Sequence, residues 1–188
     1  DDDETMGWPS GPDGEGYALV IRNPESGGDP DLAGSWRSSG RPGGQPGLDD
    51  RVTLDSWKSS NFDAAQLADP AVSGDLADPD LDGLKNFVEF MLAGDPLVAD
   101  RHRGVAVRLV EVDGKDHLAI VFRRWLAAEE LTTTVQSSAD GITWMNAAFA
   151  IESISLGGDG TQTEVWRTTG PVTSAPVELL RVMGTLDP

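Results

Sequence analysis

The sequence predicts a mainly β protein in which a short helical segment joins two β regions. Two observations lead to this prediction. The 188 residues include 22 Gly and 12 Pro, and these stand mostly between short apolar runs, as turns stand between strands. The clearest helical periodicity, by contrast, lies near the middle of the chain, at residues 84–92.

The N-terminal region, residues 1–50, predicts one strand at 17–22 and little other regular structure. The stretch 23–47 is rich in Gly, Ser and Pro and is expected to be irregular. A lone strand leaves backbone groups unpaired on both edges. We therefore expect its neighbours to come from chain preceding Asp1 or from another subunit, with an edge lent by the C-terminal region as the alternative.

The middle region, residues 51–100, predicts two helices. A short one is expected at 63–68, capped by Ser60 or Asn61. The second has an apolar stripe on one face, because apolar residues recur at i, i+3, i+4, i+7 and i+8: Leu84, Phe87, Val88, Met91 and Leu92. Gly94 is expected to cap its C-terminus. We expect the stripe to pack against a β region.

The C-terminal region, residues 101–188, predicts strands at short spacing, with Gly-containing turns at several of the connections. The expected strands are 105–112, 117–124, 131–138, 149–156, 161–168 and 177–183. Short strands at this spacing favour an immunoglobulin-like or other sandwich-type β region. The predicted fold is therefore two such β regions joined by the helical segment.

Charge and composition exclude several classes of function. The chain has 32 acidic and 14 basic residues, for a formal net charge of -18. It should repel nucleic acid and anionic membranes and attract cations. Absence of Cys excludes disulfides and thiolate metal sites, and no apolar run approaches the roughly 20 residues of a membrane span. We expect no nucleic-acid partner and no membrane insertion.

Residues 78–89 have the pattern of a twelve-residue calcium loop. Calcium binds six to eight hard oxygen ligands, and acidic residues stand here at positions 1, 3, 5 and 12. Gly83 stands at position 6, where the chain turns sharply. We predict one Ca²⁺ ion held by Asp78, Asp80, Asp82, the Leu84 carbonyl, Asn86 (directly or through water) and Glu89.

An Asp-rich turn that only caps a helix is the alternative interpretation of the same residues. A cap needs one carboxylate, whereas this loop gathers four that would repel one another without a cation. Leu81 at position 4 departs from the usual Gly but removes no ligand.

The loop, with Phe90 after it and the stop Gly94-Asp95-Pro96, resembles the EF-hand or dockerin type of calcium segment in large secreted bacterial proteins. Residues 14–21, Trp8-Pro9 and the stretch beginning at Trp36 resemble the closing part of a lamin-tail domain. Residues 122–124, 135–138 and Trp144 resemble the β module that often ends such proteins.

The resemblance implies three segments: an incomplete lamin-tail-like domain at 1–50, a helical calcium segment at 51–100 and a small β-sandwich at 101–188. It implies a C-terminal accessory region at an extracellular or cell-surface location. Its partner would be protein, either another subunit or the rest of a larger chain.

Nothing in the sequence forms a catalytic constellation. His102 and His117 have no motif partners for a triad or a zinc site, and the strand alternation turns His117 toward solvent. Glu129 and Glu130 are adjacent, point to opposite faces and fit a solvated loop. We therefore expect a non-catalytic protein, not an enzyme.

Two functions remain open at this point. The first is a calcium-binding structural or assembly module. The second, suggested by six tryptophans, is a carbohydrate-binding accessory region of a secreted hydrolase. Buried tryptophans would favour the first, and exposed coplanar ones on one sheet face the second.

Overall fold

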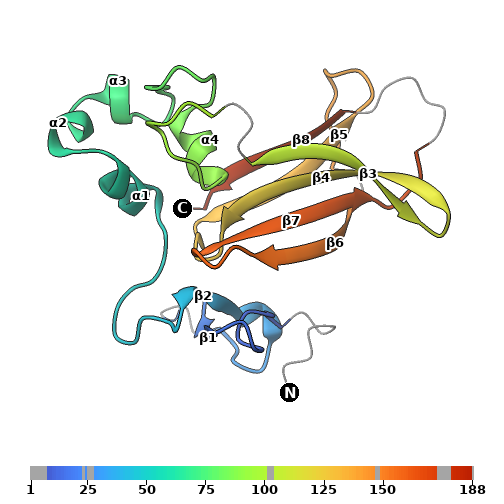
Figure 1. The fold of residues 1–188 in the computed structure, drawn as a ribbon, viewed down its shortest axis with the longest axis horizontal. Helices are drawn as coiled ribbons and strands as arrows, with labels where there is room; N and C mark the ends of the chain where they lie inside the picture. Colours follow the sequence, from blue (N-terminus) through green and yellow to red (C-terminus); the bar gives the residue numbers. More distant parts are fainter. Residues whose placement is uncertain are drawn as a thin grey trace.

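The computed structural model describes residues 8–22, 24, 28–100, 104–146, 149–172 and 179–187. These residues are mainly β, with antiparallel sheets, as the sequence predicts (Figure 1). His102 and the acidic run before Trp8 lie outside the described residues. Within the described ranges, no helix has the length and apolar composition needed to cross a membrane.

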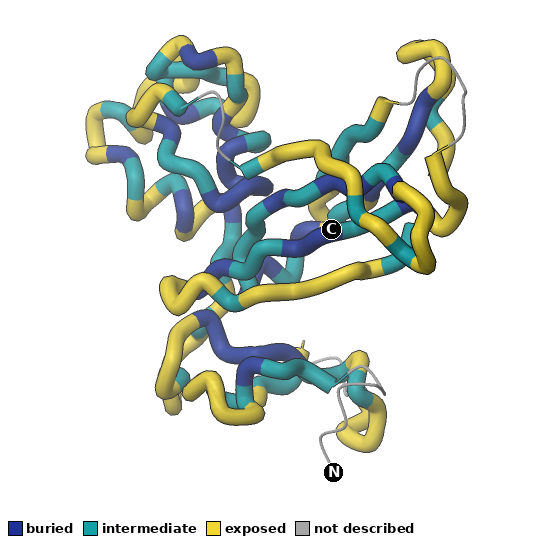
Figure 2. The backbone as a smooth tube through the Cα atoms, turned by 45° about the vertical axis from the view of Figure 1, so that its right-hand side comes forward, coloured by how far each residue is buried: buried dark blue, intermediate teal, exposed yellow. Residues whose placement is uncertain are grey.

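The C-terminal region forms two antiparallel sheets. The four-stranded sheet has the order β3-β4-β7-β6 and the two-stranded sheet pairs β5 with β8. Most residues of the outer strands β3 and β6 are exposed, whereas the inner strands β4 and β7 hold the buried positions (Figure 2). The bounds agree closely with the predicted ones: β3 Val105–Val112, β4 Lys115–Trp125, β5 Leu131–Ser138, β6 Phe149–Leu156, β7 Thr161–Thr168 and β8 Leu179–Leu186.

The N-terminal region contains two strands, so the prediction of irregular structure across 23–47 is wrong. β1 (Tyr17–Ile21) pairs antiparallel with β2 (Trp36–Pro42), and the short 3₁₀ helix η3 (Ala33–Ser35) precedes β2. One edge of β1 is thus paired within the chain, contrary to the expectation of a foreign neighbour on both edges. Among the described residues its other edge has no partner strand.

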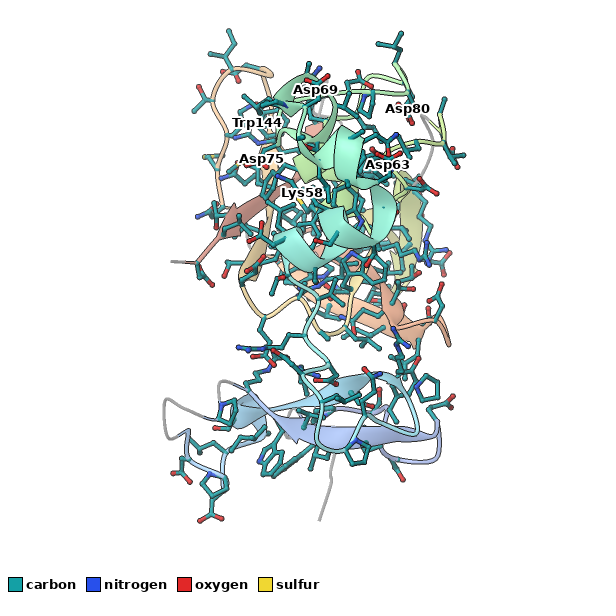
Figure 3. All side chains as sticks on the ribbon, turned by 90° about the vertical axis from the view of Figure 1, so that its left-hand side faces the viewer. Lys58, Asp63, Asp69, Asp75, Asp80 and Trp144 are labelled. Carbon is teal, nitrogen blue, oxygen red and sulfur yellow. The ribbon has the colours of Figure 1, made fainter. Side chains whose placement is uncertain are left out.

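The middle region is helical, and its described residues contain two helices beyond the two predicted. α1 (Leu54–Asn61) begins with a capping box between Thr53 and Ser56. Because α1 occupies Ser60 and Asn61, neither caps the next helix. Asp63 caps α2 (Ala64–Leu67) instead, and Asp69 caps α3 (Pro70–Ser73); both are labelled in Figure 3. α4 (Asn86–Met91) lies within the predicted second helix.

One hydrophobic core joins the helices to the sheets, which confirms that the apolar stripe of α4 packs against a β region. Met91 lies over Gly184 of β8, with its Sδ 2.7 Å from the place a β-carbon would take there. Phe90 is fully buried although the predicted stripe omitted it. The buried cluster is Leu54, Trp57, Phe62, Phe90, Met91, Leu92, Ile120, Phe122, Ala128, Leu131 and Val135.

The C-terminus of α4 uses Ala93, not Gly94, as its left-handed residue. Ala93 has φ 53°, and the Gly94 N–H donates to the Glu89 carbonyl at 2.7 Å. Close packing instead leaves little room for a side chain at Gly94. A β-carbon there would lie 3.2 Å from both Cβ and Oε1 of Glu89.

Met91→Asp is expected to destabilise the protein by about 2–5 kcal/mol even with calcium present, because it empties a packed site and buries a charge. Urea denaturation monitored by circular dichroism measures this loss. Val98→Asp is the control, since Val98 is half exposed. Equal stability losses in the two variants would contradict the core placement of Met91.

Candidate metal centre

The loop between α3 and α4 brings three aspartates together. Carboxylate oxygens of Asp78, Asp80 and Asp82 lie within 4.8 Å of one another. Figure 3 shows Asp80 on this loop, at the end of the molecule opposite the β1–β2 hairpin. The sequence predicted this convergence from spacing alone, because positions 1, 3 and 5 turn inward as the chain curls.

Two residues in left-handed conformation produce the curl. Gly83 has φ 101°, as expected for the sharp turn at position 6. Leu81 has φ 62° and its side chain is 76% exposed. Gly is more usual at this position because glycine adopts such a φ without steric cost.

Backbone N–H groups donate hydrogen bonds to some of the carboxylate oxygens and leave others without a partner. Asp78 accepts a hydrogen bond from Gly83 N at 3.2 Å, and Asp80 accepts one from Asp82 N at 3.2 Å. Asp82 accepts two, from Leu84 N at 2.7 Å and Asp100 N at 2.9 Å. One oxygen each of Asp78 and Asp80 is buried without a protein partner.

Glu89 is a fourth carboxylate near this loop, but it is not part of the group of three aspartates whose oxygens lie within 4.8 Å of one another. Its side chain is buried, with 3% exposed, and its Oε2 has no hydrogen-bond partner. Burial, followed by the negative charges of Asp80 and Asp82, raises the pKa of Glu89 to about 7. Burial also raises the pKa of Asp80, against the hydrogen bond from the Asp82 N–H. Such mutual repulsion is what a bound cation relieves.

Asn86 has a structural role that sequence reasoning missed. Its Nδ2 donates to the carbonyls of Val72 and Gly74, both at 2.8 Å, and so ties the loop to α3. The residue is fully buried and its Oδ1 has no partner among the described residues. The predicted ligand role would fall to that oxygen. The remaining predicted ligand, the Leu84 carbonyl, belongs to a half-buried residue that directly follows the turn.

The donor set fits the predicted ion. The three side-chain groups that converge here are carboxylates, which suit a hard cation such as Ca²⁺. Among the described residues, Lys85 forms an ion pair with this loop, with its Nζ 3.7 Å from Asp78 Oδ2, and it is half exposed. A surface lysine of this kind offsets little of the repulsion among the carboxylates.

Two predictions about other titratable residues are wrong. His117 is buried, with 6% exposed, and its Nδ1 lies 2.8 Å from the Thr168 carbonyl. The segment after β7 is bonded to the neighbouring residue, since Val172 N donates to Asp116 O. Glu129 is not in a solvated loop either, because it is buried in an ion pair with Arg37.

Arg37 anchors the β1–β2 hairpin to the rest of the protein. It is 2% exposed, and it pairs with Asp50 at 2.6 Å as well as with Glu129. Hydrogen bonds from Arg37 lower the pKa of Asp50, against the effect of burial. Close backbone packing lies beside this pair, since a β-carbon at Gly160 would overlap the Gly40 carbonyl.

The tryptophans do not separate the two open functions cleanly. Trp57 is a core residue with 3% exposed. The other five are half-buried: Trp8, Trp36, Trp125, Trp144 and Trp166.

No protein-family model, curated protein or solved structure matches the chain.

Stability of the calcium-free protein should fall as the pH rises from about 4.5 to 7. The pKa of Glu89 is about 7 in the folded state and 4.5 as its ordinary value. The folded protein therefore binds more protons in this window than the unfolded chain, so raising the pH favours unfolding. Thermal denaturation in chelator across this range measures the effect. Glu89→Gln should remove the part of this pH dependence that Glu89 causes. If the variant shows the same slope of stability against pH, the assignment of the raised pKa to Glu89 is contradicted.

Proposed function

We propose that the chain is a non-catalytic, extracellular calcium-binding structural or assembly module of a larger secreted or surface protein. In this proposal an EF-hand-like or dockerin-like loop at 78–89 binds one Ca²⁺ ion. The β strands of residues 104–187 form a sandwich-type module, and the β1–β2 hairpin belongs to a lamin-tail-like domain. The resemblance of the loop to secreted bacterial calcium segments supports the extracellular location.

The observation that carries the proposal is the buried, unpartnered oxygen of Glu89. A helix cap would explain one exposed Asp, but it does not explain a buried carboxylate near three others. An uncompensated buried charge costs several kcal/mol. Calcium would offset that cost by coordinating the unpartnered oxygens.

The ion's structural effect follows from what the loop touches. Asp82 accepts a hydrogen bond from Asp100 N, and the Asn86 side chain donates one to the Val72 carbonyl of α3. Glu89 lies in α4, whose Phe90 and Met91 are part of the shared core. Calcium would thus fix the start of α4 relative to α3 and to the segment leading to β3.

An assembly role is supported by the small N-terminal sheet. An isolated two-stranded hairpin is marginal in water. Here β1 and β2 have only each other as partner strands among the described residues. Additional strands from the parent chain or from another subunit would cover the open edges.

Thermal denaturation with calcium and with chelator tests the proposed function. Extracellular calcium modules bind at about 0.1–1 mM. Calcium at ten times the dissociation constant should stabilise the fold by about 1.4 kcal/mol, which raises the Tm by about 3–6 °C. Magnesium at the same concentration is the control and should give a smaller shift. Equal shifts, or none with calcium, would count against the proposal.

A further inference from the structure

The strand β3 forms one edge of the four-stranded sheet, and among the described residues only β4 pairs with it (Figure 1). Its pairing with β4 is regular over all eight residues, without a bulge. The strand contains no Pro, and Arg108 and Glu111 are its charged residues. Edge strands of natural proteins are commonly protected from further pairing by bulges, Pro or charges. The first half of β3 has little of this protection.

The opposite edge of the same sheet is better protected. The pairing of β6 with β7 has a register shift between Ile151 and Ser153. Glu152, at the shift, forms an ion pair with Arg167. A bulge bends and twists the strand that carries it, and a charge opposes the approach of another strand. Of the two edges, β3 is therefore the one suited to accept another strand.

The open edge of β3 presents backbone groups from alternate residues. The turn between β3 and β4 has two residues with positive φ, Asp113 (53°) and Gly114 (72°), and the residues that flank such a turn are a hydrogen-bonded pair. At the other end of the strand, Arg123 N donates to Gly104 O at 3.1 Å. The even-numbered residues of β3 therefore bond to β4. The N–H and C=O groups of the others point to the open edge: Val105, Val107, Leu109 and Glu111.

An apolar stripe runs along the same edge. Val105, Val107 and Leu109 are 41%, 52% and 56% exposed. Val105 and Val107 lie directly opposite Phe122 and Ile120 of β4, which are buried in the core. Directly opposite residues share a face, so the stripe continues the core side of the sheet to its edge. A strand added there would cover the stripe and bond to the backbone groups together.

We propose that the β3 edge of a second copy of this chain pairs antiparallel with this edge, about a twofold axis at Val107. The result is a symmetric dimer with one continuous sheet. Val107 faces Val107 of the second copy, and Val105 and Leu109 face each other across the axis. Each of these pairs exchanges two backbone hydrogen bonds, because their N–H and C=O groups all point to the open edge.

The side chains of β3 are complementary to themselves in this register. An axis at Arg108 would set the two arginines opposite each other, and like charges in that position are destabilising. An axis at Leu109 would set Glu111 opposite Val107 and so bring a carboxylate onto the apolar stripe. The axis at Val107 sets Arg108 opposite Ala106 and avoids both conflicts.

The order of charges along the sequence also favours an antiparallel copy. Arg101 and Arg103, which lie outside the described residues, precede β3 in the sequence, and Glu111 and Asp113 stand at its end. Opposed directions bring unlike charges toward each other, which offsets part of the repulsion between two chains with a net charge of -18 each. A strand edge is smaller than the about 1,200 Å² of a stable interface, so we expect a weak dimer.

Sedimentation equilibrium of the full chain over a range of concentrations tests this proposal. We expect a monomer–dimer equilibrium with a dissociation constant of about 10–100 μM. Val107→Lys should weaken it at least about tenfold, because it sets two ammonium groups opposite each other on the axis. Ile154→Lys is the matched control, since Ile154 is 45% exposed on β6. Circular dichroism checks that the variants fold, and Leu109→Lys replaces Val107→Lys if that variant does not.

Single cysteine variants test the register, because the chain contains no Cys. Residues of a hydrogen-bonded antiparallel pair have Cα atoms about 5.5 Å apart, a distance that a disulfide spans. Val107→Cys should therefore form a disulfide-linked dimer under mild oxidation. Leu109→Cys should not, although Leu109 is more exposed, because the two copies of residue 109 would lie about 14 Å apart.

Three results would overturn the proposal. The first is a monomer at every concentration up to about 1 mM, ten times or more the expected dissociation constant. The second is a dimer that Val107→Lys leaves intact or that Ile154→Lys weakens equally. The third is disulfide formation by Leu109→Cys as fast as by Val107→Cys. The measurements are made in calcium and in chelator, and the dimer should persist in both, so the result does not depend on the calcium proposal.

Discussion

Glu89→Gln is expected to stabilise the calcium-free protein and to weaken calcium binding about 100-fold, or about 2.7 kcal/mol. Both effects have one cause. The carboxylate is buried and feels the negative charges of Asp80 and Asp82, so removing its charge relieves repulsion when no ion is bound. The same change removes the bidentate ligand at position 12 when calcium is present. Thermal denaturation with and without chelator measures the two effects.

The opposite signs are what distinguish a metal ligand from a structural carboxylate. Asp75→Asn is the matched control, because Asp75 lies near the loop but forms a surface pair with Lys58 at 2.5 Å. It should leave both the calcium-free stability and the calcium response nearly unchanged. A Glu89→Gln variant that is less stable in chelator and unaltered in calcium affinity would show that Glu89 does not bind the ion.

Arg37→Met is expected to destabilise the protein by about 3–5 kcal/mol, because it leaves two buried carboxylates without their cation. The side chains of Asp50 and Glu129 are 8% and 6% exposed. Adding Asp50→Asn and Glu129→Gln to Arg37→Met should recover part of the loss. Urea denaturation at neutral pH measures all of these variants.

A surface ion pair supplies the control for this prediction. Arg51 pairs with Asp49 at 2.7 Å, with both side chains about half exposed. Arg51→Met should therefore cost about 0–1 kcal/mol. If Arg37→Met costs no more than Arg51→Met, the hairpin is not held by the buried pair.

The strands of the C-terminal region were predictable because their signals are local. Most are runs of β-branched and apolar residues next to a Gly-containing turn, such as Asp113-Gly114 between β3 and β4. β2 lacks this pattern, since the residues between Trp36 and Pro42 are polar or small. Its burial depends on Arg37 reaching Glu129, 92 residues away. No short stretch of the sequence includes both residues, so local patterns could not predict this contact.

α1 was missed for a related reason. Its sequence, LDSWKSSN, is rich in Ser and has weak helical periodicity. The helix is held by Leu54 and Trp57 in the core and by Glu130, whose Oε1 accepts a hydrogen bond from Leu54 N at 2.6 Å. Tertiary packing therefore decides its conformation.

The candidate metal loop was readable because its residues are close in sequence and its turn chemistry is fixed. The spacing of Asp78, Asp80 and Asp82 predicted their convergence. The hydrogen bonds from the Asn86 side-chain amide to the end of α3 were not predictable, because they depend on the path of another helix. Nor was the depth of Glu89, which the shared core determines.

Isothermal titration of the chelator-stripped chain with calcium tests the central claim most directly. We expect heat from a single class of sites with a stoichiometry of one ion per chain and a dissociation constant of about 0.1–1 mM or tighter. Glu89→Gln should abolish most of that heat, whereas Asp75→Asn should not. No calcium heat from the unmodified chain, or heat that Glu89→Gln leaves intact, would contradict a calcium site at residues 78–89.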